Sequence, residues 1–151
     1  MNKQRITWIA GMSLAGAMAL LPGCTQMKGM MGGEKSGMQH LTLSGDNEVP
    51  PVSTTASGTA MVTVNSDCTV SANVNVTGMT ATASHIHEGA PGKNGPVIVP
   101  FTKSGDNAFT APAGAKMTES QCASYKAGNT YVNVHSAKNP GGEVRAQLKG
   151  S

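Results

Sequence analysis

The chain has 151 residues, enough for one domain of ordinary size, and only 3% of them are aromatic. Its formal charge is +3, and two of its basic residues, Lys3 and Arg5, lie in an N-terminal segment that we expect to be removed. The remaining chain would have 9 basic and 8 acidic residues and a net charge of +1. Without a strong positive charge or aromatic residues for base stacking, the chain is not expected to bind nucleic acid.

The first 23 residues are typical of a bacterial lipoprotein signal peptide. The charged MNKQR precedes an apolar run from Ile6 to Leu21, whose 16 residues fall short of the ~20 that a membrane-spanning helix needs. The run ends at Leu21-Pro22-Gly23-Cys24, which resembles the lipobox whose cysteine receives a diacylglyceryl group. We therefore expect a lipid anchor at Cys24 and a location in the bacterial cell envelope, on the periplasmic side or the cell surface. Pro22 is uncommon at its position, so a general secretory signal with a chance cysteine is the alternative.

Residues 24–39 are predicted to form a flexible tether. The stretch TQMKGMMGGEKSGMQ contains four Met and four Gly and shows no apolar periodicity. Methionine thioethers are soft ligands that could bind Cu(I). A spacer that holds the domain away from the membrane is the simpler interpretation.

From residue 40 to residue 149 the sequence alternates between apolar and polar side chains. This alternation predicts antiparallel strands with one buried face. Turn signals rich in Gly, Pro, Asn and Asp recur about every 10 residues, which favours one all-β domain, a sandwich or small barrel. Glu48-Val49-Pro50-Pro51 is expected to end a strand at a rigid bend, since neither proline can donate to a ladder. The predicted strands lie in HLTLSG, GTAMVTVN, TVSANVNVTG, SHIHEG, YVNVHS and GEVRAQLK.

One segment, MTESQCASYKAGN, does not alternate and predicts a short helix near residues 119–127. Thr118 is a suitable N-cap, Glu119 suits the first turn, and Gly128 suits the position after the last turn. The helix would bring Cys122 onto the body of the domain.

The three cysteines fit an exported protein. If Cys24 carries lipid, Cys68 and Cys122 remain as a pair, and an oxidising envelope favours a disulfide between them. The bridge would close a loop of about 55 residues and stabilise the fold by about 4 kcal/mol on the chain-entropy model. Two buried free thiols are the alternative.

Three histidines can be placed by strand alternation. His85 and His87 flank Ile86, so both lie on one face, about 6–7 Å apart at the backbone, while Ile86 faces the core. The segments YVNVHS and GEVRAQL turn their apolar residues inward in the same way. The side chains then directed outward are Tyr131, Asn133 and His135 in the first segment and Glu143, Arg145 and Gln147 in the second.

If these strands are neighbours, His85, His87 and His135 converge on a site for one copper or zinc ion. Imidazole suits both metals, and because it must be neutral to bind, affinity is expected to fall as pH drops through ~6. The alternative is a set of exposed histidines, or one histidine that fixes the turn GAPGKNGP by bonding its backbone. Outward neighbours that could hold the imidazole rings are Asn133, Glu143, Arg145 and Gln147.

Three longer segments carry a resemblance to a known family. SGDNEVPPVSTTASGTA, SHIHEGAPGKNGPVIVPF and YVNVHSAKNPGGEVRAQL resemble the signature segments of the CHRD domain, in the family's order and at its usual spacing. The resemblance covers about residues 40–149 and implies an immunoglobulin-like or superoxide-dismutase-like β-sandwich, with a biochemical role that is mostly unassigned. Ala146 departs from the pattern, which more often has Gly before QL.

A fainter similarity links HIHE and the glycine-rich loop after it to the copper/zinc superoxide dismutases. It implies that His135 is a further copper ligand and that Arg145 lies beside the metal and attracts anions. Residues 89–107, which would carry the zinc ligands of those enzymes, contain no histidine, so a dinuclear site is not expected.

Three functions remain as hypotheses. The first is an envelope metal-binding module, copper preferred, which buffers or senses copper or turns over superoxide weakly. The second is a metal-free binding or structural module in which His85 or His87 bonds a backbone carbonyl and Arg145 pairs with Glu88 or Glu143. The third is a hydrolase. It is the least favoured, because G-x-S-x-G is missing and the adjacent His87 and Glu88 point to opposite faces. No catalytic residue is predicted.

Overall fold

The computed structural model describes residues 37–150 of the chain. The predicted signal peptide and most of the predicted tether lie outside the described residues, and both stay predictions. The described elements, in chain order, are β1 (Gln39–Ser44), the 3-10 helix η1 (Gly45–Asn47), β2 (Ser57–Val64), β3 (Val70–Thr77), β4 (Ala81–Glu88), β5 (Val97–Pro100), β6 (Thr102–Gly105), β7 (Ala108–Thr110), α1 (Glu119–Lys126), β8 (Thr130–Ser136) and β9 (Val144–Gln147).

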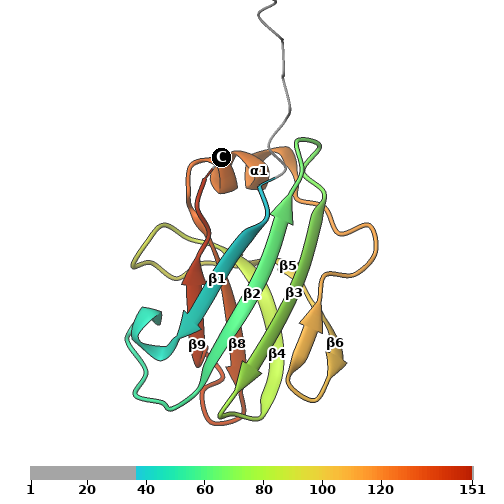
Figure 1. The fold of residues 1–151 in the computed structure, drawn as a ribbon. Coiled ribbons are helices and arrows are strands. Elements are labelled where there is room, and N and C mark those ends of the chain that lie inside the picture. The colour runs from blue at the N-terminus through green and yellow to red at the C-terminus, as the bar shows by residue number, and fades with distance from the viewer. Residues whose placement is uncertain (1–36, 151) are drawn as a thin grey trace, which may run out of the picture. The chain divides into compact units, whose positions relative to one another are not determined.

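The strands of residues 37–150 form one antiparallel sheet with the order β5-β4-β8-β9-β1-β2-β3-β7-β6. The sheet folds over on itself, so that β1, β2 and β3 pass in front of β8, β4 and β5 (Figure 1). The first and last strands of this order, β5 and β6, are separated in the chain by Phe101 alone. The result is a nearly closed sandwich, which confirms the predicted all-β fold.

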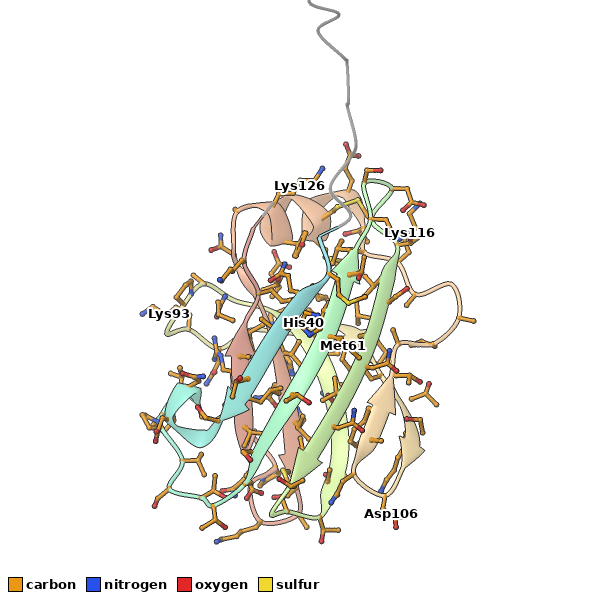
Figure 2. All side chains as sticks on the ribbon, in the orientation of Figure 1. His40, Met61, Lys93, Asp106, Lys116 and Lys126 are labelled. Carbon is orange, nitrogen blue, oxygen red and sulfur yellow. A yellow bond between two sulfur atoms is a disulfide. The ribbon has the colours of Figure 1, made fainter. Side chains whose placement is uncertain are left out.

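The apolar side chains of the alternating strands fill the space between the two layers. In β3, every second residue from Val70 is buried and every residue between is exposed. The neighbouring strands contribute Val62, Val132 and Val134, each at most 1% exposed. Burial of these side chains at about 25 cal/mol per Å² is the main stabilising contribution to the fold. The labelled charged side chains Lys93, Asp106, Lys116 and Lys126 lie on the outside (Figure 2).

Two parts of the fold differ from the sequence prediction. Strands β5, β6 and β7 were not expected, because they are only 3–4 residues long and β6, TKSG, is exposed at all four positions and carries no alternation. Glu48 does not end a strand: it follows η1 and donates its backbone N–H to the carbonyl of Gly45. Its side chain is buried, at 5% exposure.

The predicted helix near 119–127 is confirmed as α1. Thr118 is its N-cap and forms a capping box with Gln121: the Thr118 hydroxyl accepts from the Gln121 backbone N–H, and the Gln121 side chain accepts from the Thr118 backbone N–H. Gly128 follows the helix with a φ of +77°, a conformation that favours glycine. Within residues 37–150 no helix has the length and apolarity to cross a bilayer.

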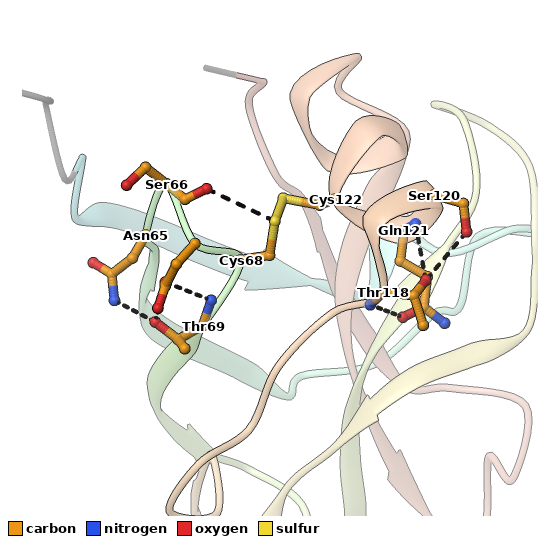
Figure 3. Close-up of a disulfide and its surroundings, with 9 residues drawn as sticks. Asn65, Ser66, Cys68, Thr69, Thr118, Ser120, Gln121 and Cys122 are labelled. Carbon is orange, nitrogen blue, oxygen red and sulfur yellow. Dashed lines mark hydrogen bonds between the residues drawn. A yellow bond between two sulfur atoms is a disulfide. The ribbon is translucent and has the colours of Figure 1, made fainter.

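The predicted disulfide between Cys68 and Cys122 is also confirmed. It joins the turn between β2 and β3 to α1, with 5.8 Å between the two Cα atoms (Figure 3). A disulfide is typical of extracytoplasmic proteins.

Candidate metal centre

Strands β4, β8 and β9 are neighbours, as the three-histidine hypothesis requires. In β4 and β8, His87 pairs with Tyr131, His85 with Asn133, and Ala83 with His135. Since paired residues project from the same side of a sheet, the three imidazoles share one face, opposite to the core valines. In β9, which lies on the other side of β8, Arg145 pairs with Asn133 and Gln147 with Tyr131.

The three histidines form one cluster. The ring centroids lie 5.4 Å apart for His85 and His87, 4.9 Å for His85 and His135, and 5.7 Å for His87 and His135. One ring nitrogen from each residue can be chosen so that all three lie within 4.8 Å of one another. The structure therefore brings together all three predicted ligands, and the cluster could hold a metal ion.

This face is less exposed than the sequence analysis predicted. His85 and His135 are half-buried, His87 is 8% exposed, and Arg145 is only 1% exposed. The reason is that the loop between β4 and β5 and the segment between β1 and β2 bond to residues of this face. Alternation reports which side chains avoid the core, and it does not report which loops then cover them.

Two backbone carbonyls fix the tautomers of the cluster. The Nδ1 atom of His87 lies 3.0 Å from the carbonyl oxygen of Gly95, and the Nδ1 atom of His135 lies 2.9 Å from that of Pro140. Because a carbonyl only accepts, each Nδ1 carries the proton and each Nε2 presents a lone pair. His85 then donates from Nδ1 to the Nε2 atom of His135 over 3.0 Å.

The Nε2 atom of His87 is buried and has no hydrogen-bond partner among residues 37–150. Buried polar atoms are normally paired, so an orphan lone pair on a ring whose centroid lies 5.4 and 5.7 Å from those of two other imidazoles indicates a place for a cation. The protein backbone holds the opposite nitrogen of the same ring, as is usual for a metal-ligating histidine.

The environment keeps the imidazoles neutral. Burial, followed by the neighbouring His135 and His87, lowers the pKa of His85 to about 4. Burial also lowers the pKa values of His87 and His135, with the charge of Arg145 a smaller cause for His87. A neutral imidazole is the form that binds metal.

Tyr131 links the cluster to Arg145. Its ring stacks on the His87 ring with centroids 4.9 Å apart and planes 8° apart, and the Arg145 guanidinium carbon lies 3.4 Å from the Tyr131 centroid. Arg145 donates to the carbonyl of Lys93 and to the side chain of Asn94. The prediction that Arg145 pairs with Glu88 or Glu143 was wrong: it holds the loop between β4 and β5 instead.

The other predicted ring-holding side chains have different partners. Asn133 donates from Nδ2 to Glu48 over 2.8 Å. Glu143 accepts from Thr54 and from Ser136. Gln147 donates to the carbonyls of Gly89 and Gly128. Backbone carbonyls of two loops hold the rings instead. The bond from His87 to Gly95 confirms the alternative in which one histidine bonds the backbone of GAPGKNGP. No pattern had indicated the bond from His135 to Pro140.

Two glycines, Gly95 and Gly142, allow their loops to pack closely against neighbouring residues. A Cβ built on Gly95 would lie 1.6 Å from the carbonyl oxygen of Glu88. A Cβ on Gly142, whose φ is +132°, would lie 2.3 Å from Nδ2 of Asn133 and 2.7 Å from Glu48. The turn signals GKNGP and NPGG were the sequence evidence for these loops, whereas no signal marked Glu48 as part of this region.

Comparison with known protein families identifies the domain that carries the cluster. The family model described as the CHRD domain matches residues 40–148. The chain belongs to the CHRD domain family. No curated protein and no solved structure matches it. The matched range contains every residue of the three-histidine cluster, so the cluster lies inside the CHRD domain.

Proposed function

We propose that the chain is an exported, membrane-anchored CHRD module that binds a single copper or zinc ion through His85, His87 and His135. The observation that carries the proposal is the orphaned Nε2 atom of His87, which is buried beside two further imidazoles whose pKa values are lowered. Copper and zinc both accept imidazole nitrogen, and three such ligands leave a further position for water or an anion.

Metal binding at these atoms needs a small rearrangement. Bonds of 2.0–2.1 Å in a tetrahedral site place ligand nitrogens about 3.3 Å apart, whereas the three candidate nitrogens lie within 4.8 Å of one another. The His85–His135 hydrogen bond already holds one pair at 3.0 Å. A metal ion bound by these two nitrogens would displace that hydrogen bond.

Calorimetric titration of the purified protein with Cu(II) and Zn(II) tests the proposal. We expect one ion per chain with micromolar or tighter affinity, and at least tenfold weaker binding in the His87→Ala variant. His40→Ala is the matched control, because His40 is the one histidine outside the cluster and lies on β1. Affinity that survives replacement of His85, His87 and His135 together would refute the site.

A metal-free structural or binding module is the second candidate. It is favoured by the bonds from His87 to Gly95, from His135 to Pro140 and from Arg145 to Lys93, each of which holds a loop. In this case the loops recognise a partner. The His87→Ala variant should then melt at a lower temperature by the same amount in EDTA and in metal, whereas a metal site predicts a larger loss when metal is present.

A further inference from the structure

The outer face of β1 and β2 carries a histidine and two methionines that the three-histidine cluster does not use. His40 on β1 is the direct antiparallel partner of Met61 on β2. Met38 precedes His40 by two residues, so continuing the alternation of β1 places it on the same face. The side chain of Met38 is 58% exposed and that of Met61 is 40% exposed.

Met38 and Met61 are two of the three large hydrophobic side chains that are exposed among residues 37–150. On the strand at its other side Met61 pairs with Asn73, so polar side chains flank it on both neighbouring strands. The imidazole of His40 is exposed and makes no hydrogen bond with another described residue. His40 and Met61 lie next to each other on β1 and β2 (Figure 2). A hollow of about 290 Å³ opens beside them, lined in part by Thr59, Asn73 and Asn75.

The spacing allows the three side chains to reach one point. Directly paired residues of an antiparallel sheet have Cβ atoms about 4.5–5.5 Å apart, and diagonal neighbours about 7–8 Å. Methionine has three rotatable bonds, so both thioethers can turn toward the imidazole. Two thioethers and one imidazole form a soft ligand set, which favours Cu(I) over the harder divalent cations.

We propose that Met38, His40 and Met61 form a second metal site, specific for Cu(I). This site lies on β1 and β2, whereas the three-histidine cluster lies on β4 and β8, and its ligands are softer. It does not depend on the proposed function of that cluster, and either site could be correct without the other. Together they would give the chain one site suited to Cu(I) and one suited to a divalent ion.

Titration with Ag(I), a redox-inert substitute for Cu(I), tests the proposal. The full-length chain is labelled with ¹³C at the methionine methyl groups. In its background Cys24 is replaced by serine and Met12, Met18, Met27, Met30 and Met31 by leucine, so that no thiol or thioether N-terminal to Met38 competes apart from Met1. We expect one Ag(I) per chain and shifts of the Met38 and Met61 methyl signals. Each of Met38→Leu, His40→Gln and Met61→Leu should weaken Ag(I) binding at least tenfold.

Control variants distinguish this site from Ag(I) binding elsewhere on the chain. Met79→Leu, at the turn between β3 and β4, should leave the affinity unchanged, as should replacement of His85, His87 and His135 together. Leucine has nearly the volume of methionine, and Met38 and Met61 are exposed, so the fold should survive their replacement. Unchanged Ag(I) affinity in any one of the three site variants would overturn the proposed site.

Discussion

Glu48 is the clearest case of a single residue whose surroundings change its chemistry. It is 5% exposed and accepts a hydrogen bond from Asn133. Burial raises its pKa to about 7, although the positive charge of Arg145 opposes the rise. The carboxyl group therefore takes up a proton more readily in the folded chain than in the unfolded chain.

The Glu48→Gln variant should become progressively more stable than the parent as pH rises. Because the folded pKa is about 7 and the ordinary value is 4.5, the folded state binds more protons between these limits, and the parent loses stability as pH increases through this window. Glutamine keeps the acceptor for Asn133 without the charge. Urea denaturation should show little difference near pH 4 and a gain of about 3 kcal/mol at pH 8.

The matched control is Asp46→Asn, which removes an exposed carboxylate two residues away. It should not reproduce the pH-dependent gain. A difference between Glu48→Gln and the parent that stays constant from pH 4 to pH 8 would show that Glu48 does not titrate differently on folding.

The histidines and Glu48 also show what single positions reveal in a sequence. His85, His87 and His135 could be assigned to one face because strand alternation is a local rule and each has a clear apolar neighbour. Glu48 could not be placed, because its burial depends on Asn133, 85 residues away in the chain, and on the close approach that Gly142 permits.

At the scale of elements, β8 organises the candidate metal centre. It lies between β4 and β9 in the sheet and supplies Tyr131, Asn133 and His135 to one face. The sequence predicted these strands and their faces, and it left open which strands are neighbours. That adjacency is set by contacts between distant parts of the chain, which alternation does not record.

The link between α1 and the β2–β3 turn should contribute measurably to stability. Replacing both Cys68 and Cys122 by serine opens a loop with a sequence separation of 54. The free energy of unfolding, measured by urea titration, should fall by about 2–4 kcal/mol, because the unfolded chain gains conformational entropy. Cys24→Ser is the control, since Cys24 takes no part in this disulfide. A double variant within about 0.5 kcal/mol of the parent would contradict the expectation.

At the scale of the whole molecule, the predicted lipid anchor at Cys24 can be tested directly. We expect the chain expressed in a bacterial host to enter the detergent phase of a phase separation, and the Cys24→Ser variant to stay in the aqueous phase, because two acyl chains on Cys24 give stable membrane binding. Cys68→Ser is the matched cysteine control and should partition like the parent. Equal partitioning of the parent and Cys24→Ser would show that Cys24 is not the anchor.

The overall fold was predictable because several independent signals agree: alternation, regular turns, a capped helix and a cysteine pair. The short strands β5, β6 and β7 escaped prediction, since β6 consists of the four exposed residues TKSG and depends on its neighbour for pairing. The burial of Arg145 was not predicted either, because the backbone carbonyl of Lys93 that it binds lies 52 residues away in the chain.

The side chain of Gln39 brings the two ends of the described domain together. Its amide donates to the carbonyl of Lys149 and accepts from the Lys149 backbone N–H, each over 2.8 Å, as a neighbouring strand would. A domain whose entry and exit points meet can be inserted into a surface loop of a host protein, or have its order of strands circularly permuted, with only a short linker. The same pair of hydrogen bonds makes the CHRD domain suitable for building fusion proteins of this kind.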